Sequence, residues 1–176
     1  MTIRVLIVDD HQVVRQGLRF VLEHEDGMEV AGEAQDGHAA LHAIRALRPD
    51  VVLLDLVMPG LDGLGVLEAL HGQQDPPAVL VLTSFLEDER VIGAIRLGAL
   101  SYLPKTTAVD RVVEAVRAAA RGASVLEPGI AAVLVRQARP RPLDALTPRE
   151  RDVLAAIARG RSNNEIARQL GMGRET

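Results

Sequence analysis

Cysteine and tryptophan are absent from the 176-residue sequence, which has only two phenylalanines and one tyrosine. Without cysteine the chain can form no disulfide scaffold, no thiolate nucleophile and no zinc ribbon. No apolar run approaches the ~20 residues that a membrane helix needs, and MTIRVLIVDD meets acidic residues too early for a signal peptide. Hydrophobic residues still make up 48% of the chain, enough for a buried core. We therefore expect a cytoplasmic protein without membrane contact.

Lysine is almost absent as well, since Lys105 is the only lysine among the 20 Lys and Arg residues. A general bias toward arginine explains most of this imbalance. A tight site can require the compact charge of lysine and refuse the planar fork of arginine. Lys105 is therefore a candidate functional residue.

Charge is divided unevenly along the chain. Residues 1–122 contain 18 acidic and 11 basic residues, whereas residues 123–176 contain 6 acidic and 9 basic ones. The net charges of −7 and +3 agree with the total of −4. An acidic first part and a basic second part indicate two modules with different partners.

Strand-like and helix-like patterns alternate through the first part of the chain. Short β-branched runs predict buried strands at 3–8, 51–55 and 78–83, and weaker patterns predict strands at 28–34 and 101–104. Amphipathic stretches between them predict helices at 12–24, 39–47, 64–70, 90–97 and 109–120. This alternation is typical of an α/β fold with a doubly wound, five-stranded parallel sheet and helices on both faces.

The second part of the chain has a different character. Residues 122–146 read as a linker with a short apolar helix at 130–139. Two capping boxes then predict helices at 148–159 and 163–170, the first half of an all-α helix-turn-helix. A third helix should begin near Arg174, and we expect most of it to be missing from a chain that ends at Thr176.

Polar residues stand at the ends of four of the predicted strands. In an open parallel sheet, ligands bind beyond the carboxyl ends of the strands. We therefore expect these side chains to converge on one edge of the sheet. They are Asp9 and Asp10 after the first strand, Asp55 at the third, Thr83 at the fourth and Lys105 after the fifth.

The three carboxylates would repel one another without a cation. An all-oxygen site with several waters suits Mg²⁺. We expect Asp10 and Asp55 to bind it directly, Asp9 to act through water, and the carbonyl of Val57 to complete the protein ligands. With Thr83 and Lys105 beside it, this site indicates phosphoryl transfer to a carboxylate.

Three histidines have possible roles beyond solvation, two as metal ligands and one beside the acidic pair. His38 and His42 are spaced for one helix face, but a solvent-exposed face explains them better. His11 follows the acidic pair directly and could tune it, although starting the first helix is the simpler role.

The motifs resemble those of a known family. LIVDDH (6–11), LLDLVMPGLDG (53–63), VLTSF (81–85) and SYLPK (101–105) are similar to the motifs of two-component response-regulator receiver domains. LTPRERDVLAAIARGRSNNEIARQL (146–170) resembles the start of a LuxR-type (NarL/FixJ) DNA-binding domain. The resemblance implies a flavodoxin-like receiver with strand order 2-1-3-4-5 at 1–121, a linker at 122–146, and part of the DNA-binding domain at 147–176.

The resemblance also implies roles for individual residues. Asp55 would accept the phosphoryl group from a sensor histidine kinase, and the chain would catalyse only its own phosphorylation and dephosphorylation. Tyr102 would turn inward when Thr83 moves. The remaining implied roles are Mg²⁺ ligation by Asp9, Asp10, Asp55 and Val57, and contact with the phosphoryl group by Thr83 and Lys105.

The implied function is a phosphorylation-switched transcription regulator that dimerises when phosphorylated and binds DNA. Because the recognition helix is expected to be missing, we expect this chain to show no promoter specificity. One alternative is a receiver whose output is protein–protein interaction. Another is a Mg²⁺-dependent phosphohydrolase, but that class uses an Asp-x-Asp pair after its first strand, whereas Asp9 and Asp10 are adjacent.

Overall fold

The computed structural model describes residues 2–84, 87–125 and 128–138. The strands in these residues are β1 (Ile3–Val8), β2 (Met28–Ala34), β3 (Val51–Leu54), β4 (Ala78–Thr83) and β5 (Ser101–Pro104). The helices are α1 (Gln12–Glu23), α2 (Gly37–Leu47), α3 (Gly63–Leu70), α4 (Asp88–Arg96), α5 (Val109–Ala119) and α6 (Pro128–Ala138). None of these helices is long and apolar enough to cross a membrane. The helices predicted at 148–159 and 163–170, and the one expected near Arg174, lie outside the described residues.

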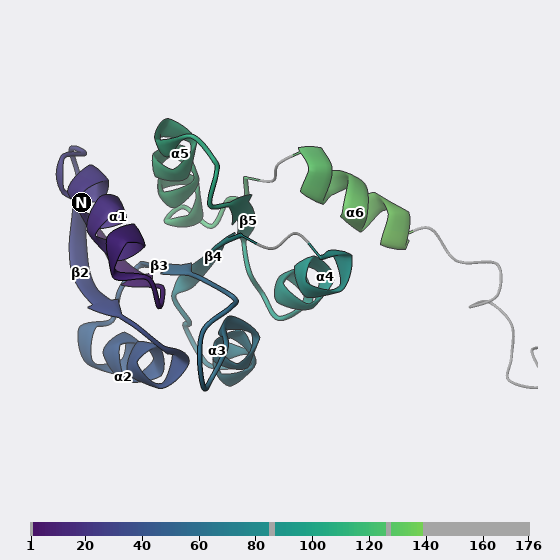
Figure 1. Cartoon of the computed structure of the whole chain (residues 1–176), viewed down its shortest axis with the longest axis horizontal. Helices are drawn as coiled ribbons and strands as arrows, with labels where there is room; N and C mark the ends of the chain where they lie inside the picture. The colour runs from purple at the N-terminus through teal and green to yellow at the C-terminus, as the bar shows by residue number, and fades with distance from the viewer. Residues whose placement is uncertain (1, 85–86, 126–127, 139–176) are drawn as a thin grey trace, which may run out of the picture. The chain divides into compact units, whose positions relative to one another are not determined.

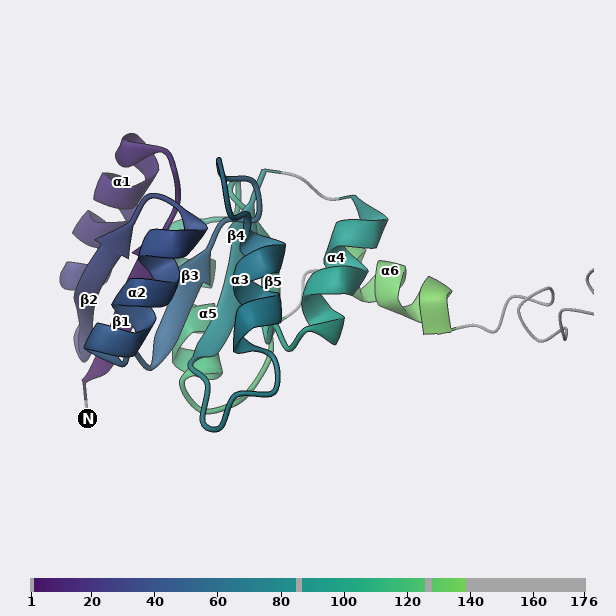
Figure 2. The same cartoon turned by 90° about the horizontal axis from the view of Figure 1, so that it is seen from below.

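The strands form one parallel sheet in the order β2-β1-β3-β4-β5 (Figures 1 and 2). This confirms the predicted fold and strand order. β1 lies second in the sheet, so the chain first passes outward to β2 and then returns past β1 to β3, β4 and β5. The β5 strand is at an edge, where Pro104 can be accommodated although it has no N–H to donate.

Helices cover both faces of the sheet (Figures 1 and 2). Alternate residues of β1 enter two separate hydrophobic clusters: Leu6 and Val8 join the first, and Val5 and Ile7 join the second. The first cluster contains the buried residues of α2, α3 and α4, and the second contains those of α1 and α5. Burial on both faces explains why the central strands are runs of apolar residues rather than alternating patterns.

The α6 helix belongs to the first cluster through two residues. Ile130 is 3% exposed and Val133 is 6% exposed, and both are grouped with the core residues of α4 and β5. The compact unit that contains the sheet extends to Leu134. The receiver predicted at 1–121 therefore packs with part of the segment that the sequence assigned to the linker.

Two helices begin slightly earlier than predicted because an aspartate caps each of them. Asp36 accepts a hydrogen bond from the backbone N–H of Ala39 at 2.8 Å, so α2 begins at Gly37 rather than at residue 39. Asp62 caps α3 in the same way. Gly63 then lies so close to the backbone of β3 that a Cβ atom would overlap the carbonyl oxygen of Asp55. This glycine brings the start of α3 close to the carboxyl end of β3.

Candidate functional site

The carboxyl edge of the sheet brings the predicted acidic residues together. The backbone N–H of Asp9 donates to Ala34 of β2 at 3.1 Å, and that of Asp55 donates to Val8 of β1 at 2.9 Å. These bonds place both aspartates directly at the ends of paired strands. The side chains of Asp9 and Asp55 are 4% exposed, whereas that of Asp10 is 30% exposed. Asp9 and Asp55 are thus buried acids, and Asp10 lies at the opening to solvent.

Lys105 connects the two buried carboxylates. Its Nζ atom lies 2.6 Å from Oδ2 of Asp9 and 2.6 Å from Oδ2 of Asp55. Burial by itself would lower the pKa of Lys105, but the hydrogen bonds to Asp55 and Asp9 outweigh this effect and raise the pKa above its ordinary value. A single compact ammonium therefore remains charged between two carboxylates, a geometry that suits lysine better than the larger guanidinium of arginine.

The other oxygen of each buried carboxylate faces the backbone. Oδ1 of Asp9 accepts from the N–H of His11 at 2.8 Å, and Oδ1 of Asp55 accepts from the N–H of Val57 at 3.2 Å. Both carboxylates are therefore held in a fixed orientation from two sides. This explains how two acidic side chains can be buried at the end of an apolar sheet without an unsatisfied oxygen.

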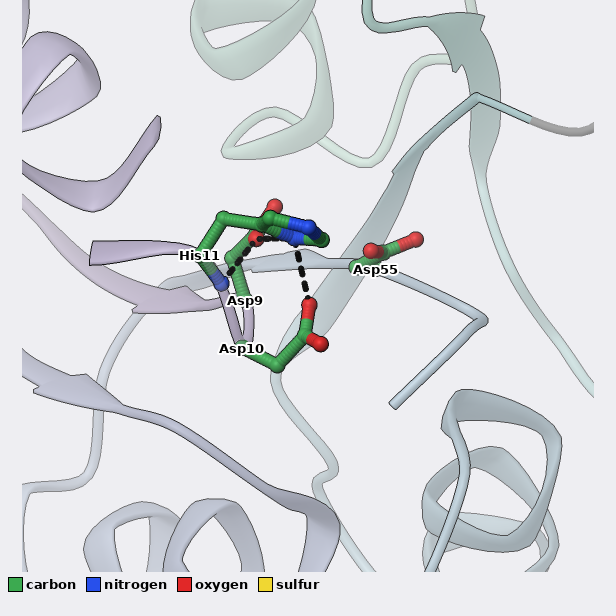
Figure 3. A group of neighbouring side chains, drawn as sticks. All are labelled: Asp9, Asp10, His11 and Asp55. Carbon is green, nitrogen blue, oxygen red and sulfur yellow. Dashed lines mark hydrogen bonds and ion pairs between the residues drawn. The ribbon is translucent and has the colours of Figure 1, made fainter. Parts of the chain in front are cut away.

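The donor set fits a divalent cation. One oxygen from each of Asp9, Asp10 and Asp55, together with a nitrogen of His11, lie within 4.8 Å of one another. Figure 3 shows these four side chains, with interactions joining His11 to both Asp9 and Asp10. Three carboxylates face one ammonium, so the cluster keeps an excess of negative charge that a cation would neutralise. Hard oxygen donors of this kind suit Mg²⁺.

Thr83 and Tyr102 lie on the two strands that lead to this edge. Thr83 is fully buried at the end of β4, and the backbone N–H of Lys105 donates to its carbonyl oxygen at 2.9 Å. Tyr102 pairs with Val81 across the β4–β5 ladder and is fully buried in the first hydrophobic cluster. Burial, together with the nearby charge of Asp55, raises the pKa of Tyr102 to about 12. The phenol therefore stays neutral at physiological pH.

Two features of the site, a side-chain contact of His11 and a hollow beside Asp10, were not predicted from the sequence. His11 was interpreted as the start of α1, but Nδ1 of its ring lies 2.6 Å from Oδ1 of Asp10. The signal was its position directly after the acidic pair. A hollow of about 580 Å³ also opens beside Asp10. Its lining comes from loops at the carboxyl edge of the sheet and from the first turn of α2: Asp10, Gln35, Asp36, His38, Pro59 and Gly60.

Two family matches cover most of the chain. Residues 5–117 match the response regulator receiver domain, and residues 144–176 match the bacterial regulatory proteins of the luxR family. Among curated proteins, the chain is 41% identical to the transcriptional regulatory protein LiaR of Bacillus subtilis, over 96% of this chain and 82% of LiaR.

Solved structures give the same result. The response regulator ChrA of a heme-sensing two-component system is 36% identical, with a TM-score of 0.64 over 98% of this chain and 83% of ChrA. A structure of two RcsB dimers bound to two parallel DNAs is 26% identical, with a TM-score of 0.71 over 98% of this chain and 85% of RcsB. The similarity to both structures therefore extends beyond the receiver fold.

Proposed function

The chain belongs to the LuxR-type response regulators, which are regulators of transcription, and we propose that phosphorylation of Asp55 switches it. The observation that carries this proposal is the contact of one ammonium, that of Lys105, with both Asp9 and Asp55 at 2.6 Å. A charge so placed can bind an oxygen of an incoming phosphoryl group without leaving the carboxylates. The family membership favours this function over the phosphohydrolase and over an output by protein–protein interaction alone.

The proposed reaction is transfer of a phosphoryl group from a phosphohistidine of a sensor kinase. A carboxylate oxygen of Asp55 forms the new bond to phosphorus, the bond from phosphorus to the imidazole nitrogen breaks, and the imidazole leaves with its electron pair. Lys105 and the hydroxyl of Thr83 bind the equatorial oxygens, where negative charge must be neutralised. The chain itself thus supplies the nucleophile and part of the charge stabilisation for its own phosphorylation.

Asp9, Asp10, Asp55 and the carbonyl of Val57 are the residues that would hold Mg²⁺. When bound, the ion would neutralise the charge that the phosphoryl group adds to three carboxylates. Asp9 and Asp55 are already oriented by backbone N–H groups, and Asp10 is the most exposed of the three acids. Asp10 is therefore the residue through which a hydrated ion would reach the site.

The switch residues connect this site to the rest of the receiver. We place Thr83 in contact with the phosphoryl group and Tyr102 as the aromatic side chain that responds to its movement. Tyr102 is fully buried and belongs to the first hydrophobic cluster. Its neighbours in the first hydrophobic cluster include residues of α4 and α6, through which a change at Thr83 could reach the linker.

The proposed partners follow from the two matched families. The receiver would take its phosphoryl group from a sensor histidine kinase, and the phosphorylated chain would form a homodimer on DNA. The related RcsB binds DNA as dimers, which supports this output. The assignment of the DNA-binding part to 147–176 and the cytoplasmic location stay predictions.

Acetyl phosphate and Mg²⁺ provide a direct test that needs no kinase. We expect the whole chain to gain one phosphoryl group, measured by intact mass, and Asp55→Asn to gain none. Asp110→Asn is the matched control, because Asp110 is exposed near the start of α5. Equal labelling of Asp55→Asn and the unsubstituted chain would overturn the proposal.

A further inference from the structure

We propose that His11 is a direct metal ligand in the acidic cluster and gives this site a preference for borderline transition ions such as Ni²⁺ and Zn²⁺ over Mg²⁺. The inference rests on the proposed function, since it assumes that a divalent cation binds among the same carboxylates. The proposal adds a nitrogen ligand to a site for which the sequence predicts only oxygen ligands.

The ring of His11 already lies at ligand spacing from its neighbours. Nδ1 lies 2.6 Å from Oδ1 of Asp10 and 3.3 Å from Oδ1 of Asp9. When two ligand atoms each lie ~2.1 Å from an ion and occupy neighbouring coordination positions, they are about 3 Å from each other. The two measured separations lie on either side of that value, and the ligand oxygen of Asp55 is within 4.8 Å of the other three atoms. One ion could therefore contact all four groups after small side-chain movements.

The backbone holds His11 in this position, while its ring reaches toward the carboxylates of Asp9 and Asp10. His11 is the N-cap residue of α1, but its side chain makes no capping hydrogen bond. Its backbone N–H donates to Oδ1 of Asp9, which ties the turn to the buried acid. The ring is 65% exposed, so packing does not restrain it strongly. It can move a fraction of an ångström toward an ion at little cost.

The chemistry of the donors then determines which ions gain from His11. Mg²⁺ prefers oxygen and keeps several waters, so it would bind the carboxylates and leave the imidazole aside. Ni²⁺, Cu²⁺ and Zn²⁺ bind imidazole nitrogen well and stand above Mn²⁺ and Fe²⁺ in general affinity order. In this structure Nδ1 faces carboxylate oxygens of Asp10 and Asp9 and therefore carries a proton. Binding of such an ion would release this proton, so that Nδ1 presents its lone pair and the hydrogen of the neutral ring is on Nε2.

A pair of histidines on α2 is another possible site for these ions, and the experiment must distinguish it from the site at His11. His38 and His42 are exposed on α2 and are four residues apart, a spacing that places them on one helix face. Such a pair could bind the same transition ions. His42→Ala removes this pair without touching the acidic cluster, so it is the matched control for His11→Ala.

Calorimetric titration of the whole chain with Ni²⁺ and, separately, with Mg²⁺ tests the inference. We expect His11→Ala to weaken Ni²⁺ binding at least about tenfold and to change Mg²⁺ binding less than about twofold. We expect His42→Ala to leave the tight Ni²⁺ site intact. Unchanged Ni²⁺ affinity in His11→Ala, equal weakening of both ions, or loss of the tight site in His42→Ala would each overturn it.

Two further measurements keep the two proposals distinguishable. Asp10→Asn should weaken Mg²⁺ binding, and if it does not, the proposed cation site fails rather than the role of His11. In the unsubstituted chain, the side-chain ¹⁵N resonance of His11 Nδ1 should shift on addition of Zn²⁺ and not on addition of Mg²⁺. No shift with Zn²⁺ would overturn the role of His11 without relying on any variant.

Discussion

The ammonium of Lys105 lies 2.6 Å from Oδ2 of Asp55. Asp55 follows β3 and Lys105 follows β5, and β4 lies between these two strands. The same nitrogen lies 2.6 Å from Oδ2 of Asp9 at the end of β1. One side chain thus crosses the carboxyl edge of the sheet and holds two buried acids. We therefore expect both stability and the proposed chemistry to depend on this single cation.

Lys105→Met should therefore destabilise the chain. The substitution keeps an unbranched side chain but leaves Asp9 and Asp55 buried without a positive partner. Breaking a buried pair in this way costs about 3–5 kcal/mol, which urea unfolding would measure. Added Mg²⁺ should restore part of the loss, because we expect it to bind the acidic cluster of the folded chain and not the unfolded chain. Arg96→Met, at an exposed position of α4, is the control, and an equal effect in both variants would contradict the bridging role.

The side chain of Val57 should slow the loss of the phosphoryl group from Asp55. Its backbone N–H contacts Oδ1 of Asp55, and an apolar side chain at this position cannot orient an attacking water. Val57→Asn supplies polar atoms there, so the half-life after removal of acetyl phosphate should fall on the order of tenfold. Val109→Asn is the exposed control on α5. An unchanged or longer half-life in Val57→Asn would count against this shielding.

Glu33 should contribute stability that disappears in acid. Burial would raise the pKa of Glu33, but hydrogen bonds from Arg19 and Arg15 outweigh it and hold the pKa below its ordinary value of 4.5. The folded state therefore favours the charged form. The stabilisation is complete above pH 4.5 and is lost as the pH falls through the lower pKa of the folded chain.

Glu33→Gln should accordingly lower the free energy of unfolding by about 0.5–1 kcal/mol at pH 7. The difference from the unsubstituted chain should shrink as the pH is lowered below 4.5. Glu68→Gln, at an exposed position of α3, is the control. A difference that stays constant down to acid pH would show that the charge of Glu33 is not its source.

Ile130 should stabilise the receiver although it lies on α6. It is 3% exposed within the first hydrophobic cluster, so Ile130→Ala should cost about 2–4 kcal/mol. Val135 is on the same helix but is 57% exposed, and Val135→Ala should cost much less. Urea unfolding followed by circular dichroism compares the two. Similar small losses would mean that α6 is not part of the receiver core in solution.

The sequence was sufficient to predict the sheet and the residues at its edge. The central strands are buried on both faces, so β1, β3 and β4 appear as continuous apolar runs that end at polar residues. Because parallel strands share one carboxyl edge, the positions of Asp9, Asp55 and Thr83 followed from their places in the chain. The helix starts were less predictable, since Asp36 allows α2 to begin on Gly37, a residue with low helix propensity.

Contacts made by side chains were not predictable in the same way. The sequence placed Lys105 near the acids but could not show that its ammonium contacts both Asp9 and Asp55, because this depends on the reach of a flexible chain. Nor could it show that the ring of His11 turns back toward Asp10. The apolar residues at 130–139 predicted a short helix, but not the surface against which it packs.

The site of phosphorylation tests the central claim most directly. After the whole chain reacts with acetyl phosphate and Mg²⁺, borohydride reduces an aspartyl phosphate to homoserine, and peptide mass spectrometry identifies the residue that was modified. The account predicts homoserine at position 55 and at no other carboxylate, with none in a sample that was not phosphorylated. Homoserine at another aspartate, or a stable phosphoryl group on a histidine with none at position 55, would contradict it.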